Sequence, residues 1–204
     1  PAVTVTITED ANDDGIINSA ELSGNAGVRV GLPGGAVAGD TINITDGITP
    51  QSIVLTAADI TAGFVDTSFA APATGSTLTV TATLTDTNGN TSAAVSDSAL
   101  IDTFAPAVTV TITEDANNDG IINTAELSGP ANVSIGLPGG AAVGDIVTVS
   151  DGTTTTTITL VAADLLAGTV TTSFAAPASG STLTVTATLT DANGNVSATS
   201  SDSA

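Results

Sequence analysis

The chain has 204 residues, enough for one large domain or two of common size. It carries 21 acidic residues against a single base, Arg29, for a formal net charge of −20, and it contains no His or Cys. This composition excludes a His-based catalytic triad, a thiol nucleophile and a Cys/His zinc site. We expect no nucleic-acid partner, because a chain without a basic patch cannot displace phosphate counterions. We also expect no membrane insertion, because no apolar run reaches 18 residues.

The predicted elements of the first half are short strands with a period of two. Aliphatic residues alternate with Thr in residues 3–8 and again in 78–85, which is typical of a strand with one buried and one exposed face. The strands predicted in chain order are residues 3–8, 28–32, 41–45, 52–56, 63–69, 78–85 and 92–101. Gly, Pro, Asn and Asp clusters separate them. Helix is limited to turns near residues 20–22 and 57–59.

Seven short strands in about 100 residues predict an antiparallel immunoglobulin-like β-sandwich. Hydrophobic residues make up 41% of the chain but aromatic residues only 2%, so the core must be aliphatic. Phe69 and Phe174 are the best candidates for large core side chains. The same hydrophobic content argues against disorder, which needs low hydrophobicity as well as high charge.

The chain consists of two copies of one sequence unit. Residues 1–10 recur letter for letter as 106–115, and about 70 aligned positions match without a gap. A repeat of this length is a domain, since solenoid repeats are far shorter. We therefore predict domains at residues 1–101 and 106–204, joined by a linker at residues 102–105.

A calcium-loop pattern follows the first predicted strand of each unit. The twelve-residue loop binds calcium through oxygens at positions 1, 3, 5, 7, 9 and 12, with Gly at position 6 for the sharp turn. Gly15 and Gly120 occupy that sixth position. The predicted ligands, with the position-7 residue acting through its backbone carbonyl, are Asp10, Asn12, Asp14, Ile16, Asn18 and Glu21 in the first copy and Asp115, Asn117, Asp119, Ile121, Asn123 and Glu126 in the second.

The alternative interpretation of each loop is a surface turn rich in Asp, Asn and Gly, which such clusters commonly form. A full match that occurs twice favours calcium. A strand precedes each loop where sensor proteins have a helix, so the pattern indicates a structural ion without a signalling role. The only change at an acidic or amide position, Asp13 to Asn118, falls at position 4, which needs no ligand.

A second calcium site is predicted at the junction between the domains. In an up-and-down arrangement of the strands, three oxygen-rich segments share one pole of the second domain, and crowded carboxylates there would repel without a cation. The predicted ligands are Asp102, Asp145, Asp191, Asn193 and Asn195. The alternative is that these Asn-Gly and Asp-Gly pairs serve only as turns. The matching residues of the first domain are Asp40, Asp86, Asn88 and Asn90.

Two other functions receive little support. Rows of Thr could order ice, but solvent-facing sandwich strands commonly carry Thr. Paired carboxylates could cleave glycosides, but the acids here fall in calcium-loop and turn positions, and there is no aromatic platform for a sugar. We therefore expect no enzyme activity.

The sequence resembles the tandem immunoglobulin-like repeats of giant RTX-type and biofilm-associated adhesins of Gram-negative bacteria. The resemblance rests on Thr-Asp-Xaa-Asn-Gly-Asn-Xaa-Ser-Ala at residues 85–93 and 190–198, on Ser-Asp-Ser-Ala at 96–99 and 201–204, and on Asp-Thr-Phe-Ala-Pro at 102–106. It implies calcium-binding spacer repeats, and Asp102, Asp191 and Asn195 match the junctional calcium positions that the family leads us to expect.

The resemblance also implies type I secretion without an N-terminal signal peptide, an extracellular location at the bacterial surface and a role in adhesion and biofilm formation. We expect a monomer whose partners are calcium ions and neighbouring repeats of the same chain. Such repeats project a distal ligand-binding domain. The alternative is a calcium-dependent module that itself binds a carbohydrate or a host surface.

Overall fold

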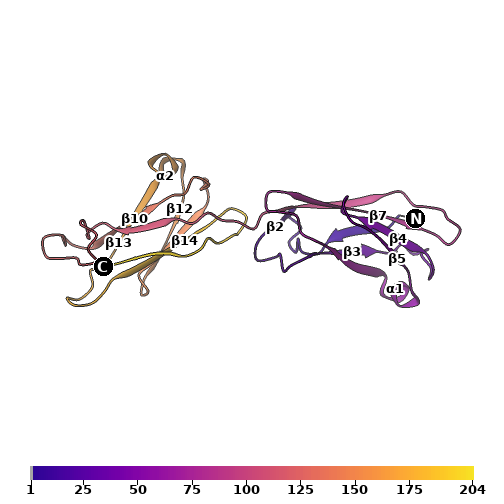
Figure 1. Cartoon of the computed structure of the whole chain (residues 1–204), viewed down its shortest axis with the longest axis horizontal. Helices are drawn as coiled ribbons and strands as arrows, with labels where there is room; N and C mark the ends of the chain where they lie inside the picture. Colours follow the sequence, from indigo (N-terminus) through magenta and orange to yellow (C-terminus); the bar gives the residue numbers. More distant parts are fainter. Residues whose placement is uncertain (1) are drawn as a thin grey trace. The chain divides into compact units, whose positions relative to one another are not determined.

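The computed structural model describes residues 2–204 and is all-β, as the sequence predicts (Figure 1). The chain divides between Thr103 and Phe104 into two compact units, called unit 1 and unit 2 below. Within the described residues, no helix is long and apolar enough to cross a membrane.

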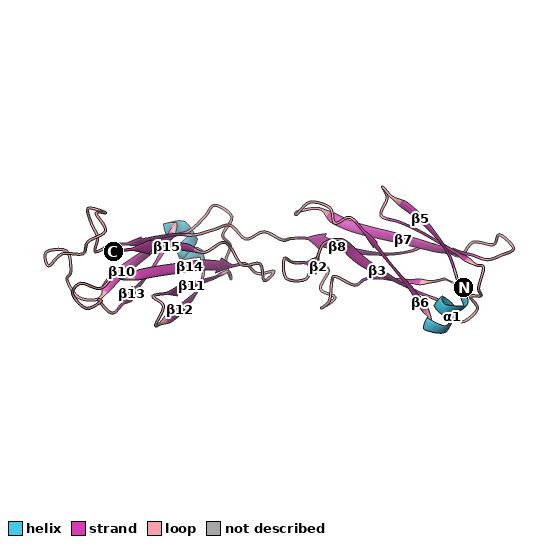
Figure 2. Cartoon of the chain, turned by 60° about the horizontal axis from the view of Figure 1, so that its bottom comes forward, coloured by secondary structure: helices cyan, strands magenta, loops and turns pink. Residues whose placement is uncertain are grey.

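Unit 1 is a sandwich of a three-stranded and a five-stranded sheet, in the orders β1-β3-β6 and β2-β8-β7-β4-β5 (Figure 2). Its elements are β1 (Thr4–Ile7), β2 (Ile16–Ile17), β3 (Ala26–Gly31), β4 (Thr41–Thr45), β5 (Pro50–Val54), α1 (Ala57–Ala62), β6 (Phe64–Phe69), β7 (Thr77–Thr85) and β8 (Val95–Ile101). All neighbouring strands are antiparallel except β2 and β8, which are parallel.

Unit 2 repeats this arrangement in sheets ordered β9-β10-β13 and β12-β11-β14-β15. Its elements are β9 (Thr109–Ile112), β10 (Ala131–Gly136), β11 (Ile146–Ser150), β12 (Thr155–Thr159), α2 (Ala162–Ala167), β13 (Thr169–Phe174), β14 (Thr184–Thr190) and β15 (Ser200–Ser203). Residues 121–122 form no strand here, whereas the corresponding residues 16–17 of unit 1 form β2.

The strand order within the sheets differs from the strand order along the chain. β3 pairs with β6 and β4 pairs with β7, so the chain crosses between the two sheets instead of following one after the other. The reason is that each strand has one apolar face. When the strands are divided between two sheets, the apolar faces of one sheet can be buried against those of the other.

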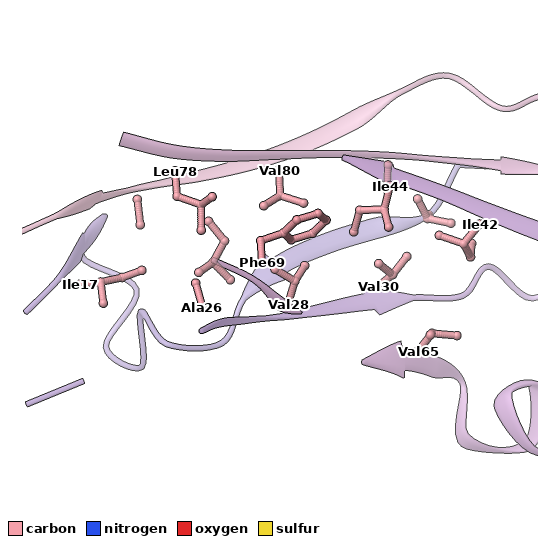
Figure 3. Packing of buried hydrophobic residues seen from close by; sticks show 14 of the residues in the cluster. Ile17, Ala26, Val28, Val30, Ile42, Ile44, Val65, Phe69, Leu78 and Val80 are labelled. Carbon is pink, nitrogen blue, oxygen red and sulfur yellow. The ribbon is translucent and has the colours of Figure 1, made fainter. Parts of the chain in front are cut away.

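The core is aliphatic with one large aromatic ring per unit, as predicted. Phe69 is 2% exposed and Phe174 3% exposed. Figure 3 shows the Phe69 ring between strands of the two sheets, with Val80 and Ile44 on one side and Val28 and Val30 on the other. Because the buried residues alternate with exposed or half-buried Thr along β7, one strand supplies both the core and the surface.

The single turn predicted near residues 57–59 is part of a longer helix, α1, and unit 2 has the corresponding helix α2. In α1 the Thr56 hydroxyl accepts a hydrogen bond from the Asp59 N–H at 3.3 Å, and the Asp59 carboxylate accepts one from the Thr56 N–H at 2.8 Å. This capping box starts the helix, and Gly63 ends it in the left-handed conformation at φ 80°. In α2 the Asp164 carboxylate makes the corresponding bond to the Val161 N–H, but Val161 has no hydroxyl to complete the box.

The missing hydroxyl predicts a stabilising substitution. Val161→Thr is expected to raise the free energy of unfolding of unit 2 by about 1 kcal/mol, and Thr56→Val to lower that of unit 1 by a similar amount. Val161 is 51% exposed, so the change removes little buried apolar surface. Scanning calorimetry of the full chain measures both effects. Val161→Ala is the control, and equal melting temperatures for Val161→Thr and Val161→Ala would contradict the prediction.

Candidate metal centre

The first predicted calcium loop lies between β1 and β3 and is closed by hydrogen bonds to Asp10. One carboxylate oxygen of Asp10 accepts from the Asp14 N–H at 3.0 Å, and the other accepts from the Gly15 N–H at 2.9 Å. Asp13 and Gly15 both have left-handed backbones, at φ 58° and 83°. These two positions reverse the chain so that it folds back around the Asp10 side chain, and Gly adopts that conformation without steric cost.

The predicted ligands at positions 3 and 5 belong to the same network. The Asn12 side-chain amide donates to Asp14 at 2.9 Å, and the Asn12 carbonyl oxygen accepts from the Asp14 N–H at 3.1 Å. The other carboxylate oxygen of Asp14 accepts from the Ile16 N–H at 2.8 Å. The structure therefore brings Asp10, Asn12 and Asp14 together on one side of the loop.

The predicted ligands at positions 9 and 12 form a separate local cluster. The Glu21 carboxylate accepts from the Asn18 N–H at 3.0 Å, and the Asn18 side chain accepts from the Ala20 and Glu21 N–H groups. Ile16 and Ile17 lie between the two clusters and form β2, which the sequence analysis missed. Two residues are too short for a periodic signal, so no pattern in the sequence could have revealed this strand.

The second loop repeats these contacts. Asp115 accepts from the Asp119 and Gly120 N–H groups at 3.0 and 2.9 Å, and Asn117 donates to Asp119 at 2.9 Å. The Glu126 carboxylate accepts from the Asn123 N–H at 3.0 Å. Ile121 differs from its counterpart Ile16, because it is 65% exposed and pairs with no strand.

The donor chemistry of both loops fits calcium, which prefers carboxylate, amide and backbone carbonyl oxygens. Among residues 2–204, however, no three Asp or Glu side chains gather closely enough to form a ready cation cage. The carboxylates of positions 1, 5 and 12 accept hydrogen bonds from their own loop instead. The loops have suitable ligand types and turn geometry for calcium, and calcium binding by them stays a prediction.

The residues predicted for the junction site are described within their own units. In unit 2, Asp191 accepts from the Asn193 and Asn195 N–H groups, both at 2.9 Å, and from the Asn195 side-chain amide at 2.9 Å. Ile146 on β11 pairs with Thr190 on β14. Asp145, which directly precedes Ile146 and is 2% exposed, therefore lies beside the loop that begins at Asp191. Asp102 belongs to unit 1, where its N–H donates to the Ile17 carbonyl at 3.0 Å. The junction site itself stays a prediction.

At the corresponding pole of unit 1, the two matching segments contact each other. One carboxylate oxygen of the buried Asp40 accepts from the Val37 N–H at 3.0 Å, and the other accepts from the Thr87 N–H at 3.2 Å. Asp86 accepts from the Asn90 backbone and side chain, each at 2.8 Å.

One acidic residue in each unit, which the sequence analysis did not single out, joins the two sheets of the sandwich. Asp97 on β8 accepts from the Ile7 N–H on β1 at 2.8 Å, and Asp202 on β15 accepts from the Ile112 N–H on β9 at 2.8 Å. Each carboxylate thus ties an edge strand of one sheet to the other sheet. The repeated Ser-Asp-Ser-Ala motif was the available signal, but its partner is 90 residues away.

The single base of the chain is part of a surface cluster in unit 1. Arg29 forms a two-point ion pair with Asp66, with both N···O distances 2.8 Å, and its guanidinium lies 3.8 Å from the centre of the Phe64 ring. Unit 2 has Ser134, Thr171 and Thr169 at these positions. Loss of all three in the second copy indicates a local contact that the fold does not require.

Comparison with known proteins gives a structural likeness to a bacterial adhesin. No protein-family model and no curated protein matches the chain. A solved structure described as concerned with host cell surface retention of a 1.5-MDa bacterial ice-binding adhesin matches 99% of this chain and 63% of its own length, with 27% identity and a TM-score of 0.50. The chain therefore spans less than two thirds of that structure.

Two further structures match less closely. A tetra-tandem repeat from the extending region of a large adhesion protein has 22% identity and a TM-score of 0.33 over 99% of this chain and 48% of that one. Fibronectin type III-like modules of CbhA from Clostridium thermocellum have 13% identity and a TM-score of 0.46 over 98% and 92%.

The Asp86 turn predicts a specific pH dependence. Hydrogen bonds from the Asn90 side chain and backbone hold the pKa of Asp86 below its ordinary value. A lowered folded-state pKa stabilises the fold above the unfolded pKa of about 3.9, and that stability is lost as pH falls through the folded pKa. Asp86→Asn is therefore expected to lower stability at pH 6, with the gap to the wild type closing in strong acid.

Urea unfolding of the wild type and Asp86→Asn at several pH values tests this prediction. Far-UV circular dichroism is the suitable probe, because the chain has no Trp or Tyr for fluorescence. Asp13→Asn is the control, because it removes the same charge at a loop position where the second unit already has Asn118. A gap between the wild type and Asp86→Asn that stays constant down to pH 2 would contradict the prediction.

Proposed function

We propose that this chain is a pair of structural spacer repeats from a bacterial surface adhesin. The single observation that carries the proposal is the likeness over 99% of the chain to the structure from a bacterial ice-binding adhesin. The match is to an adhesin and not to an enzyme, which supports a non-catalytic role at the cell surface or outside the cell.

The way the unit is built supports a spacer. Each unit buries an aliphatic core, covers its strands with Thr and places most of its acidic residues in loops. The two copies agree at the loop oxygens and at the turns but differ at the Arg29 cluster. This is what we expect when structure is selected and no particular surface is required for binding a ligand.

We propose that calcium stiffens these repeats. The chain leaves unit 1 beside the first loop, because the Asp102 N–H bonds to the Ile17 carbonyl and the Leu100 N–H bonds to the Gly15 carbonyl. A cation held by the loop would therefore restrain the strand that leads out of the unit. It would also offset the repulsion of 21 acidic residues, which opposes compaction.

The calcium proposal has a direct test. Extracellular modules bind calcium at about 10⁻⁴–10⁻³ M, so millimolar calcium is expected to stabilise each loop-bearing unit by roughly 1 kcal/mol. For domains of this size that corresponds to a rise in melting temperature of roughly 5 °C. Calorimetry of the full chain in calcium, in magnesium and in chelator measures it.

The variants separate ligation from charge. Asp14→Ala together with Asp119→Ala removes the position-5 oxygen ligand from both loops and should abolish most of the calcium effect. Asp13→Asn removes one charge from position 4, where Asn118 already stands in the second loop, and should leave the effect intact. Equal calcium responses in all three proteins would rule out the loops as the binding sites.

A further inference from the structure

The two units differ in how they protect one edge strand. In the part of the chain that the structure describes, β5 and β12 lie at the ends of their sheets, and each pairs with a single strand, β4 or β11 (Figure 2). An edge strand presents backbone N–H and C=O groups to which another strand can bond. Proteins commonly prevent such pairing with proline or with charged side chains on the edge.

The hydrogen bonds next to β12 show which of its backbone groups face the open edge. The Leu160 N–H donates to the Asp145 carbonyl at 2.8 Å, and the Leu160 carbonyl accepts from the Gly144 N–H at 2.9 Å. Both backbone groups of Leu160 therefore point to the side of β11, and this direction alternates from residue to residue along an antiparallel strand. The residues whose backbone groups point to the open edge are Thr155, Thr157 and Thr159.

Unit 1 protects the same edge with Pro50 and Gln51. The Leu55 N–H donates to the Asp40 carbonyl at 2.7 Å, so the alternation is the same and Pro50 stands at an outward position. Proline has no N–H, so the edge loses a donor there. The Gln51 side-chain amide donates to the Ser68 carbonyl on β6 at 3.0 Å, which ties β5 to the other sheet. β5 is therefore a poor template for a further strand.

Unit 2 lacks both of these features. Thr155 replaces Pro50 and restores the outward N–H, and Thr156 replaces Gln51 and has no side-chain amide. β12 reads Thr-Thr-Thr-Ile-Thr, so it has no charge and no proline and consists only of β-branched residues. A strand of this composition at an open edge is suited to pairing with another strand.

We propose that β12 pairs with β12 of a second copy of this chain, antiparallel and about a two-fold axis at Thr157. A two-fold axis presents the same strand from both sides, so the outward groups of Thr157 bond to those of Thr157 in the second copy. Thr155 then lies opposite Thr159. Charge favours this strand as the point of contact, because copies with a net charge of −20 repel each other and β12 carries no charge.

The size of the edge makes the association of two free chains weak. Five residues bury far less surface than a standard interface between proteins. Chains projected side by side from one surface would pair at a high local concentration. That consequence depends on the proposed spacer role, whereas the pairing of β12 does not. The pairing also differs from the monomer that the sequence analysis expects.

Cysteine cross-linking tests the pairing, because the chain has no Cys of its own. In two paired Thr157→Cys chains the Cα atoms at this position would lie about 5.5 Å apart, within the range of a disulfide. Ser52→Cys is the matched control, since Ser52 is the counterpart of Thr157 on the protected β5. Oxidised glutathione is the oxidant, and chelator is present throughout, so that failure of the calcium proposal does not affect the result.

The rate of dimer formation is measured at about 0.5 mM chain, which suits a weak association, and in about 0.3 M NaCl, which screens the repulsion between copies. We expect disulfide-linked dimers of Thr157→Cys to form roughly tenfold faster than those of Ser52→Cys, because pairing holds the two thiols at a high local concentration. Equal rates for the two proteins would overturn the proposal.

A proline variant separates edge pairing from chance collision of thiols. Thr155→Pro in the Thr157→Cys chain removes an outward N–H and copies the protection that Pro50 gives unit 1, so the rate should fall to that of Ser52→Cys. Far-UV circular dichroism checks that this variant is folded, as the presence of Pro50 at the same position of unit 1 leads us to expect. A rate that stays high in the folded variant would also overturn the proposal.

A mixture of two variants tests the direction of the strands. Thr155→Cys and Thr159→Cys should link to each other faster than either links to itself, because the antiparallel pair places these residues opposite each other. Isotope labelling of one variant lets mass spectrometry separate the mixed dimer from the two others. Faster linking of like with like would overturn the two-fold arrangement.

Discussion

The packing of two alternating aliphatic faces across each sandwich is the constraint on which the rest of the structure depends. With aromatic residues at only 2% of the chain, the core consists of many small Val, Ile, Leu and Ala contacts and a single Phe in each unit. Such a core demands close registration of both sheets. It also leaves most charged residues to the loops and edges, because a buried unpaired carboxylate would cost more than this packing supplies.

The loops use those carboxylates as acceptors for backbone N–H groups. Asp10, Asp40 and Asp86 each hold a turn in this way, and their counterparts do the same in unit 2. The acidic side chains therefore stabilise the turns through hydrogen bonds, in addition to contributing negative charge. A cation would compete with these N–H groups for the same oxygens, so calcium binding and loop conformation are expected to be coupled.

The duplication inside the chain separates what the fold needs from what it tolerates. The edge bonds of Asp97 and Asp202 are present in both units, whereas the Arg29 pair is present in one. The pairing of β2 with β8 shows how the end of one unit can stabilise its own loop. In a tandem protein this arrangement makes the connecting segment part of the domain, which suits a spacer.

The sequence by itself determined the all-β class, the seven main strands of unit 1 to within a few residues, the aliphatic core and the repeated unit. These follow from local alternation and turn residues, which act over short distances. Only the tertiary structure decided the crossing of strands between sheets, the two-residue β2, and the contacts of Asp97 and Asp202 with strands 90 residues away. These features depend on which surfaces of the two sheets come into contact when the sandwich forms. An alternation of apolar and polar residues along one strand carries no information about contacts between distant strands.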